Sequence, residues 1–165
     1  MKAPSYSRAI VVGASSGIGA ALVEALVARG VRVAALARRD GELQQLAARL
    51  QPLCAQSGAR LVVRVHDVAH TAEVPALFEE LHTQLGGVDL VIYAAALMPK
   101  TAPDEYNTEQ DLAQLAVNVG GCIAWGNARR ACTRPSGMEC SWASPRSPVS
   151  VVAKAIPSMA PPKPP

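Results

Sequence analysis

The sequence predicts an α/β fold, a doubly wound parallel sheet that is incomplete at its C-terminal side. Short apolar runs rich in β-branched residues alternate with helical stretches between residues 8 and 128. A glycine-rich turn joins the first apolar run to the first helix, and the alternation stops after about residue 128, where prolines accumulate. Alternating strands and helices predict right-handed crossovers and therefore a parallel sheet.

The first half of the chain supplies two strands and two helices. The run RAIVVG at 8–13 is a predicted strand, and VRVAALA at 31–37 is a second one. Between them, apolar residues at helical spacing predict a helix over 17–30, which ends on a glycine. Asp40 is the predicted N-terminal cap of the next helix, 41–56.

The second half continues the pattern. Strands are predicted at 60–68 and 88–96, and the near-continuous apolar run of the latter indicates burial on both faces. A helix is predicted over 73–87, with a proline in its first turn, where proline is tolerated. Residues 108–128 predict a long helix that two adjacent glycines weaken.

The organisation of the chain follows from this pattern. At 165 residues, with 50% hydrophobic and 18% charged side chains, the chain is expected to form one globular domain. Residues 1–128 form the predicted domain. Residues 129–165 have no sustained periodicity and predict an irregular, disordered tail rich in proline and serine.

Composition excludes several classes of function. The net charge of +3 comes from scattered basic residues without aromatic neighbours, so we expect no nucleic-acid partner. The four cysteines form no Cys-x-x-Cys pair, so we expect no metal site and reduced thiols in the cytosol. The apolar stretch 9–28 contains glycines, serines and a glutamate, which fit a strand–turn–helix better than a signal peptide. No run approaches the length of a membrane span, so a cytoplasmic protein without membrane contact is predicted.

The stretch VVGASSGIGAALVEAL carries the strongest chemical signal. Gly13, Gly17 and Gly19 follow a predicted strand and open a helix. Gly13 permits a tight turn, Gly17 lets the backbone approach a phosphate, and Gly19 lets helix and strand pack closely. The helix N-terminus then offers N–H groups and a positive dipole end to a pyrophosphate. Ser15, Ser16 and Ile18 complete the predicted phosphate-binding turn.

The motif GASSGIG closely resembles the glycine motif of the short-chain dehydrogenase/reductase (SDR) family, and the resemblance continues to about residue 128. It implies a Rossmann-like NAD(P)-binding domain over 1–128. HDV resembles the family's Asp-Val, which would place Asp67 against the adenine amino group with Val68 beside it. YAAA stands where the family has Asn-Asn-Ala-Gly, so Ala94, Ala95 and Ala96 are expected along the cofactor.

The sequence departs from the family at several of these positions. Val12 stands where the family often has threonine, and Ala94 and Ala96 replace an asparagine and a glycine. In the family, the backbone of this segment lines the cofactor, so alanine side chains are compatible with cofactor binding. Ala96 slightly narrows the space for the cofactor compared with glycine.

The end of the second predicted strand indicates which dinucleotide is preferred. Enzymes selective for NAD place an acid there to bind the ribose 2′-hydroxyl, but this sequence has Ala37. Arg38 follows and would pair with the 2′-phosphate of NADP. NADP(H) is therefore the predicted cofactor over NAD(H). The alternative for Arg38 and Arg39 is a solvated loop.

The catalytic residues that the family implies are a tyrosine, a lysine four residues later and a serine about thirteen residues before the tyrosine. The chain has three tyrosines, none followed by that lysine: Tyr6, Tyr93 and Tyr106. Only Asn118, in VNVGG, matches the family's catalytic asparagine. Its alternative role is a helix residue that bonds the backbone.

The proline-rich tail conceals a second pattern. Read one base out of frame, the codons of residues 158–165 can encode Tyr-Gly-Ala-Ser-Lys-Ala-Ala, and those of 142–149 can encode Gly-Ile-Ser-Ser-Val-Ala-Gly. The genetic code forces a glycine at the codon pairs Trp142–Ala143 and Met159–Ala160. The second serine falls thirteen codons before the tyrosine, as in the family. We hypothesise a one-base frame slip near residues 128–132. The alternatives are a natural proline-rich tail and an alternative transcript.

These observations predict an NAD(P)-dependent oxidoreductase of the SDR type, which transfers hydride between NADP(H) and a ketone or secondary alcohol. This chain is expected to be truncated and inactive, since it lacks the serine, tyrosine and lysine and the helix that the family uses for oligomers. The alternative is a non-catalytic protein that binds NADP(H) or serves as an interaction protein. The substrate of the intact parent is expected to be a small carbonyl or alcohol.

Overall fold

The computed structural model describes residues 6–100, 102 and 104–132. Its centre is one sheet of four strands in the order β3-β2-β1-β4. Every pairing is parallel, with Ile10 opposite Ala34 on one side and Val91 on the other. The strands are β1 Arg8–Val12, β2 Arg32–Ala37, β3 Leu61–Val65 and β4 Leu90–Tyr93. The predicted α/β fold with a parallel, Rossmann-like sheet is thereby confirmed.

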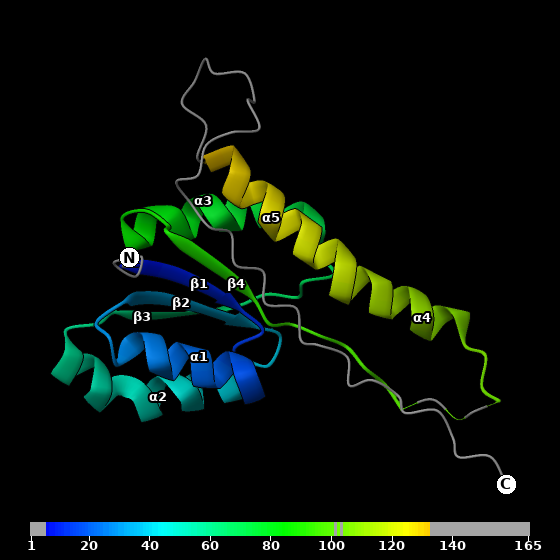
Figure 1. Ribbon diagram of the computed structural model, residues 1–165, viewed down its shortest axis with the longest axis horizontal. Coiled ribbons are helices and arrows are strands. Elements are labelled where there is room, and N and C mark those ends of the chain that lie inside the picture. Colours follow the sequence, from blue (N-terminus) through cyan, green and yellow to red (C-terminus); the bar gives the residue numbers. More distant parts are fainter. Residues whose placement is uncertain (1–5, 101, 103, 133–165) are drawn as a thin grey trace, which may run out of the picture.

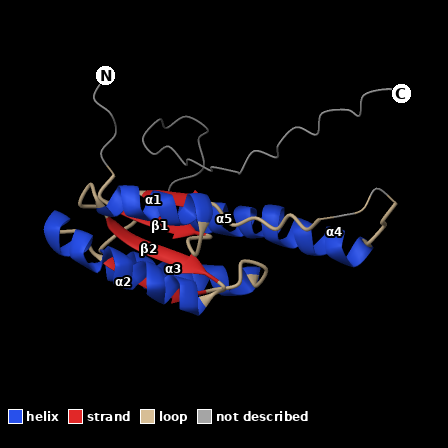
Figure 2. Ribbon diagram, turned by 90° about the horizontal axis from the view of Figure 1, so that it is seen from below, coloured by secondary structure: helices blue, strands red, loops and turns tan. Residues whose placement is uncertain are grey.

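Helices cover both faces of the sheet. Figure 1 shows α1 and α2 on one face and α3 and α5 on the other, which is the doubly wound arrangement. The helices are α1 Gly17–Val27, α2 Asp40–Ser57, the 3₁₀ turn η1 Thr71–Glu73, α3 Val74–Leu85, α4 Thr108–Leu115, the π-helical turn η2 Ala116–Gly120 and α5 Gly121–Cys132. The segment α4–η2–α5 is one continuous run, and α4 projects beyond the sheet (Figure 2).

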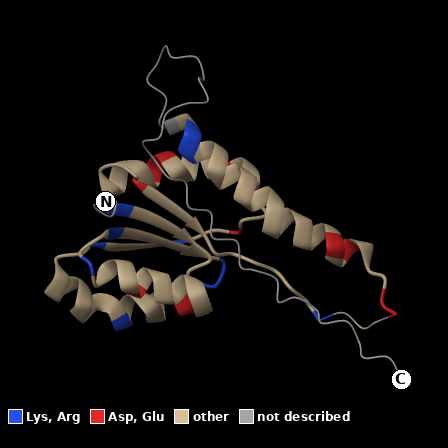
Figure 3. Cartoon of the chain, in the orientation of Figure 1, with Lys and Arg blue, Asp and Glu red and all other residues tan. Residues whose placement is uncertain are grey.

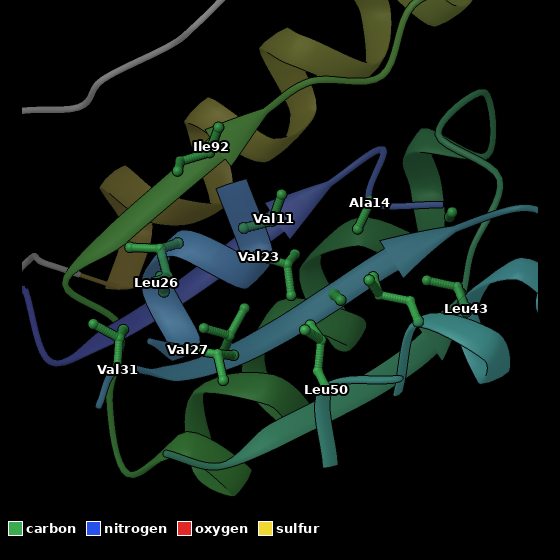
Figure 4. Packing of buried hydrophobic residues seen from close by; sticks show 14 of the residues in the cluster. Val11, Ala14, Val23, Leu26, Val27, Val31, Leu43, Leu50 and Ile92 are labelled. Carbon is green, nitrogen blue, oxygen red and sulfur yellow. The ribbon is translucent and has the colours of Figure 1, made fainter. Parts of the chain in front are cut away.

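Alternation along the strands divides the core into two clusters. Val11 on β1 faces α1 and α2, where it packs with Val23, Val27 and Leu43 (Figure 4). Its neighbour Ile10 faces the other side, toward α3 and α5. All four residues of β4 are buried, as the sequence pattern predicts for a strand covered on both faces.

The second cluster is built around the largest side chains of the domain. Phe78 of α3 and Trp125 of α5 are both fully buried, and their rings lie 6.3 Å apart. With few aromatic residues in the chain, aliphatic residues and alanine fill the rest of the core. Figure 3 shows acidic residues in the first turn of α4 and basic residues in the last turn of α5, which suits the helix dipole.

Most strand and helix ends differ from the predicted boundaries by a few residues. The third strand ends at Val65 rather than at 68, and the fourth at Tyr93 rather than at 96, because the backbone leaves the sheet to line a cleft. Arg39, not Asp40, occupies the N-cap of α2. Asp40 is the first helical residue, where its carboxylate still lies near the positive end of the helix and accepts from Gln44 at 3.1 Å.

The long helix continues through Gly120 and Gly121, where its hydrogen-bonding pattern changes. Residues 116–120 form a π-helical turn, in which the N–H of Gly121 reaches the carbonyl of Ala116. The helix then continues to Cys132, past the predicted end at 128. Within the described part of the chain, no helix is long and apolar enough to cross a membrane. Of the predicted tail, 129–165, residues 129–132 belong to α5, and 133–165 lie outside the described residues.

Candidate functional site

A cleft of about 240 Å³ lies at the carboxyl ends of the strands. This is where parallel α/β sheets bind their ligands. The turns after β1 and β2, the segments after β3 and β4, and the π turn η2 all contribute to it. Its lining residues are Gly13, Ser15, Ser16, Gly17, Ile18, Gly19, Ala37, Arg38, Arg39, His66, Val68, Ala94, Ala95, Ala96 and Val117.

The cleft gathers every residue predicted to bind the cofactor except Asp67. Sequence reasoning did not assign Ala37, Arg39, His66 or Val117 to the site. Proximity to a strand end could have included the first three, and Val117 adjoins Asn118 in the π turn. Asn118 does not line the cleft, and its place is described below.

Gly13 and Gly19 are glycines for steric reasons. Gly13 has φ +91°, and a Cβ there would lie 2.6 Å from the Cα of Ala95 and 2.7 Å from the carbonyl carbon of Ala94. A Cβ on Gly19 would overlap the carbonyl oxygen of Gly13 and lie 2.8 Å from its carbon. The three chain segments therefore touch through bare backbone. Both N–H groups of the turn, from Gly13 and Ala14, donate to the carbonyl of Leu36 at 2.7 and 2.9 Å.

Gly17 differs from the other two glycines of the motif. Its φ of +56° favours glycine, but a Cβ there would meet nothing within 4 Å. The space above it is open, at the first residue of α1. A helix leaves its first N–H groups without helical partners, and they carry the positive end of its dipole. The turn is thus shaped to accept an anion against bare backbone.

Two arginines after β2 face different neighbours at the rim of the cleft. Arg39 Nη2 donates to the hydroxyls of both Ser15 and Ser16 at 2.9 Å. Arg38 Nη1 lies 3.9 Å from a carboxylate oxygen of Asp67, and its side chain is more than half exposed. Such an exposed, long ion pair contributes little stability, so the guanidinium of Arg38 remains adaptable. Arg39, rather than Arg38, is the arginine held against the glycine turn.

Asp67 and Val68 follow β3 in different roles. Val68 is buried and lines the cleft. The carboxylate of Asp67 accepts the N–H of Ala69 at 3.0 Å, which closes a local turn. The side chain of Asp67 does not line the cleft, but it lies near Arg38, which does.

His66 stands between the cleft and the core. Its side chain is almost fully buried, its ring meets that of Trp125 edge-on at 5.8 Å, and its Nδ1 lies 3.5 Å from Glu73. Burial lowers the pKa of His66, although the nearby carboxylate of Glu73 opposes this. The Nε2 atom of His66 has no hydrogen-bond partner within the described chain. His66 is therefore a neutral, core-facing histidine at neutral pH.

Three alanines form the opposite wall of the cleft. The N–H of Ala94 donates to the carbonyl of Val12 at 2.7 Å, which continues the sheet one step beyond β4. Ala95 and Ala96 follow along the cleft. None of the three carries a polar side chain that could fix its own position, so the neighbours of the segment must hold it.

Asn118 holds the end of this alanine segment. Its Oδ1 accepts the N–H of Leu97 at 2.7 Å, and its Nδ2 donates to the carbonyl of Leu97 at 2.9 Å. Both functions of the amide are thus engaged with one residue of backbone. Asn118 lies in the π turn, a feature that often marks functional sites.

Tyr93 is buried at the start of the same segment. Its hydroxyl donates to the carbonyl of Val117. Burial raises the pKa of Tyr93 well above its ordinary value, and the neighbouring Cys122 and Asp67 add to this. A phenol that is held protonated and engaged with a carbonyl does not serve as a general acid or base. Tyr106 is 95% exposed, far from any comparable environment.

Metal chemistry finds no support in the part of the chain that the structure describes. No group of three or more histidine, cysteine or carboxylate residues is placed to hold an ion there. Cys54 and Cys122 are free thiols. The cleft can therefore bind an anionic ligand through backbone and arginines, but it holds no metal centre among these residues.

Comparison with known proteins identifies one family. The family model described as short chain dehydrogenase matches residues 7–129. An uncharacterized oxidoreductase of Staphylococcus saprophyticus is 35% identical over 120 residues, which are 73% of this chain and 50% of that protein. Dehydrogenase/reductase SDR family member 11 of Homo sapiens is 36% identical over 91 residues, 54% of this chain and 34% of its own length. The chain thus spans half or less of these relatives.

Solved structures agree on the fold. An alcohol dehydrogenase from the archaeon Thermococcus sibiricus, complexed with 5-hydroxy-NADP, matches with a TM-score of 0.68 and 26% identity, over 76% of this chain and 52% of its own. A short chain dehydrogenase from Burkholderia cenocepacia in complex with NADP matches with a TM-score of 0.68 and 28% identity, over 76% of this chain and 50% of its own.

Proposed function

Because the chain belongs to the short-chain dehydrogenase family, we propose that its cleft binds NADP(H). The observation that carries the proposal is the convergence at one cleft of bare glycine backbone, a helix N-terminus and two arginines. The residues fit the group, because Gly17 leaves open space where a pyrophosphate would meet the N-terminus of α1.

The two arginines favour the phosphorylated dinucleotide. Ala37 ends β2 without the carboxylate that would bind a 2′-hydroxyl and repel a 2′-phosphate. Arg39, held by Ser15 and Ser16, and Arg38, close to Asp67, offer charge-assisted donors beside it. The two NADP-type complexes among the structural neighbours support this preference.

The other binding roles follow from position. Val68 and the backbone beside it would contact the adenine, with Asp67 near its amino group. The alanine wall, Ala94 to Ala96, would lie along the rest of the cofactor, and Ile18 would face it from the first turn of α1. These roles rest on the lining of the cleft.

A bound nicotinamide dinucleotide supplies hydride transfer to or from a carbonyl or alcohol carbon. We propose that the intact parent of this chain is such an oxidoreductase, acting on a small ketone or secondary alcohol in the cytosol. This chain contains no Tyr-x-x-x-Lys sequence, so it is expected to bind without turnover. Asn118 would help to position the alanine wall, since the oxygen and the nitrogen of its side-chain amide both bond the backbone of Leu97.

The reading frame offers a reason for the missing pair. The family match ends at residue 129, inside the interval 128–132 where the frame slip is hypothesised. The test is the nucleotide sequence from codon 120 to beyond codon 165. A one-base shift that opens a long frame with Tyr-x-x-x-Lys supports a catalytic parent. A confirmed frame, with stops or other residues in the shifted one, favours a non-catalytic NADP(H)-binding protein instead.

Binding is tested by titrating the purified chain with NADPH and with NADH and following dinucleotide fluorescence. A charge-assisted contact to the 2′-phosphate predicts a dissociation constant about ten- to hundredfold lower for NADPH. Arg39→Ala should remove most of this difference, whereas Arg49→Ala should leave it intact, because Arg49 of α2 pairs with Glu24 and does not line the cleft. Absence of binding to either dinucleotide would refute the proposal.

A further inference from the structure

The alanine wall of the cleft is anchored at both ends to the same π turn. Tyr93 precedes the wall, and its hydroxyl donates to the carbonyl of Val117. Leu97 follows the wall, and its backbone is bonded twice by Asn118, at 2.7 and 2.9 Å. Val117 and Asn118 are neighbours in η2. The two anchors therefore tie a segment without polar side chains to one rigid helical element.

The first anchor, the hydrogen bond from Tyr93 to Val117, requires a glycine at position 121. A Cβ on Gly121 would overlap the hydroxyl oxygen of Tyr93, and it would lie 3.1 Å from the ring carbon Cζ and 3.0 Å from the carbonyl oxygen of Val68. The phenol thus fills the space that any side chain at 121 would take. Tyr93 is 4% exposed, so its hydroxyl has no water to replace Val117 as a partner.

The position of the wall matters because of what it touches. Gly13 meets Ala94 and Ala95 backbone to backbone, closer than a Cβ would allow. A shift of the wall therefore moves the glycine turn as well, and it changes the shape of the cleft that both segments line. Alanine side chains offer no other means to correct such a shift, since they make no hydrogen bonds.

We propose that Tyr93 is a positioning residue for the nucleotide cleft. Its hydroxyl donates to the carbonyl of Val117, in space left free by Gly121, and this hydrogen bond fixes the position of the alanine wall. This inference rests on the proposed binding of NADP(H) and deepens it. It assigns the position of the wall to a residue that touches no ligand. Tyr93 fixes the start of the alanine wall by its bond to Val117, and Asn118 fixes the end of the wall by its two bonds to Leu97.

The test uses the full chain and four single variants. Tyr93→Phe removes the hydroxyl, and Tyr106→Phe is its matched control on an exposed tyrosine. Gly121→Ala adds a Cβ against Tyr93, and Gly126→Ala, in the same helix with nothing within 4 Å of its Cβ, is the control. The double variant Tyr93→Phe/Gly121→Ala removes the oxygen that the added Cβ would meet.

The first readout is amide hydrogen exchange at Leu97, compared with Ala35 in the central strand β2. Loss of a buried hydrogen bond predicts about tenfold faster exchange at Leu97 in Tyr93→Phe, with a smaller change at Ala35. Equal acceleration at both amides would mean that Tyr93 contributes only to global stability, and the proposal would be wrong. This readout needs no nucleotide.

The second readout is the dissociation constant for NADPH. Tyr93→Phe should raise it about three- to tenfold, and Gly121→Ala about tenfold or more, while both controls stay near wild type. The double variant should bind within about threefold of Tyr93→Phe alone, because the clash with the hydroxyl is gone. A double variant as weak as the product of the two single effects would overturn the pairing.

The two proposals fail in different ways. If the wild-type chain binds no NADPH, the proposed function is wrong, and exchange at Leu97 alone decides whether Tyr93 sets the wall. If the wild type binds NADPH but Tyr93→Phe matches Tyr106→Phe in both readouts, the proposed function stands and the positioning role is wrong.

Discussion

Substituting Gly19 by alanine tests whether the glycine turn is held by backbone contact. The added Cβ would overlap the carbonyl oxygen of Gly13 and lie 2.8 Å from its carbon and 3.1 Å from the Cα of Ala14. All three atoms are backbone, so no flexible side chain can move aside. The turn itself must shift, and Gly13 is already pressed against Ala94 and Ala95.

The magnitude follows from two opposing effects. Overpacking against rigid neighbours costs about 3 kcal/mol, and alanine in place of glycine in a helix returns about 1 kcal/mol. Gly19→Ala should therefore lower the free energy of unfolding by about 2 kcal/mol. Gly41→Ala, in α2 with nothing within 4 Å of its Cβ, is the matched control and should gain up to about 1 kcal/mol.

Urea unfolding and thermal melting of the two variants measure this difference. At about 3 °C per kcal/mol for a chain of this size, their melting temperatures should differ by roughly 6–9 °C. Gly19→Ala should also raise the dissociation constant for NADPH about tenfold or more, because the phosphate turn is displaced. Equal stability and equal affinity of the two variants would refute the steric reasoning.

Two further predictions concern charge. Arg39→Ala should reduce the preference for NADPH over NADH more than Arg38→Ala does, since Arg39 is the arginine held at the glycine turn by two hydroxyls; equal losses in parallel titrations would contradict this ranking. The folded-state pKa of His66 is lowered by burial, so its contribution to stability is complete above its unfolded pKa of about 6.5 and declines as the pH falls toward the folded value. Urea unfolding between pH 7.5 and 5 should show this loss in wild type and in the control His70→Asn, whose side chain is 65% exposed, but much less in His66→Phe.

The fold was predictable because its signals are local. Each strand is a short, mostly apolar run, and the glycine turn after β1 marks the first crossover in the sequence itself. The end of β4 was placed three residues too far because the apolar residues at 94–96 continue past Tyr93, where they line the cleft. The end of β3 was also placed three residues too far: His66 and Asp67 interrupt the apolar run after Val65, and Val68 resumes it at the cleft. Periodicity does not distinguish apolar residues that line a cleft from those of a strand.

The parts of the site that are formed by backbone were predictable from the sequence. The hydrogen-bond partners of individual side chains were less predictable. The three glycines follow from sterics, and their roles can be read from their spacing. Which of two adjacent arginines turns toward Ser15 and Ser16 depends on where α2 begins. It begins at Asp40, the predicted cap, so Arg39 takes the N-cap position. The bond from Tyr93 to Val117 spans 24 residues and needs the π turn, which no local pattern predicts.

The geometry separates binding from turnover. The contacts that hold the cleft join elements between β1 and α5, from the glycine turn to the anchors of the alanine wall and the packing of Trp125 against His66. General acid–base chemistry, in contrast, needs a tyrosine whose pKa a neighbouring lysine lowers, and the described phenol closest to the cleft has its pKa raised by burial. The proposed function therefore predicts that the chain binds NADP(H) and that, with no Tyr-x-x-x-Lys sequence, it does not oxidise or reduce a second substrate. Hydride transfer by the purified chain would therefore require a proton donor other than a Tyr-Lys pair, and it would contradict this separation.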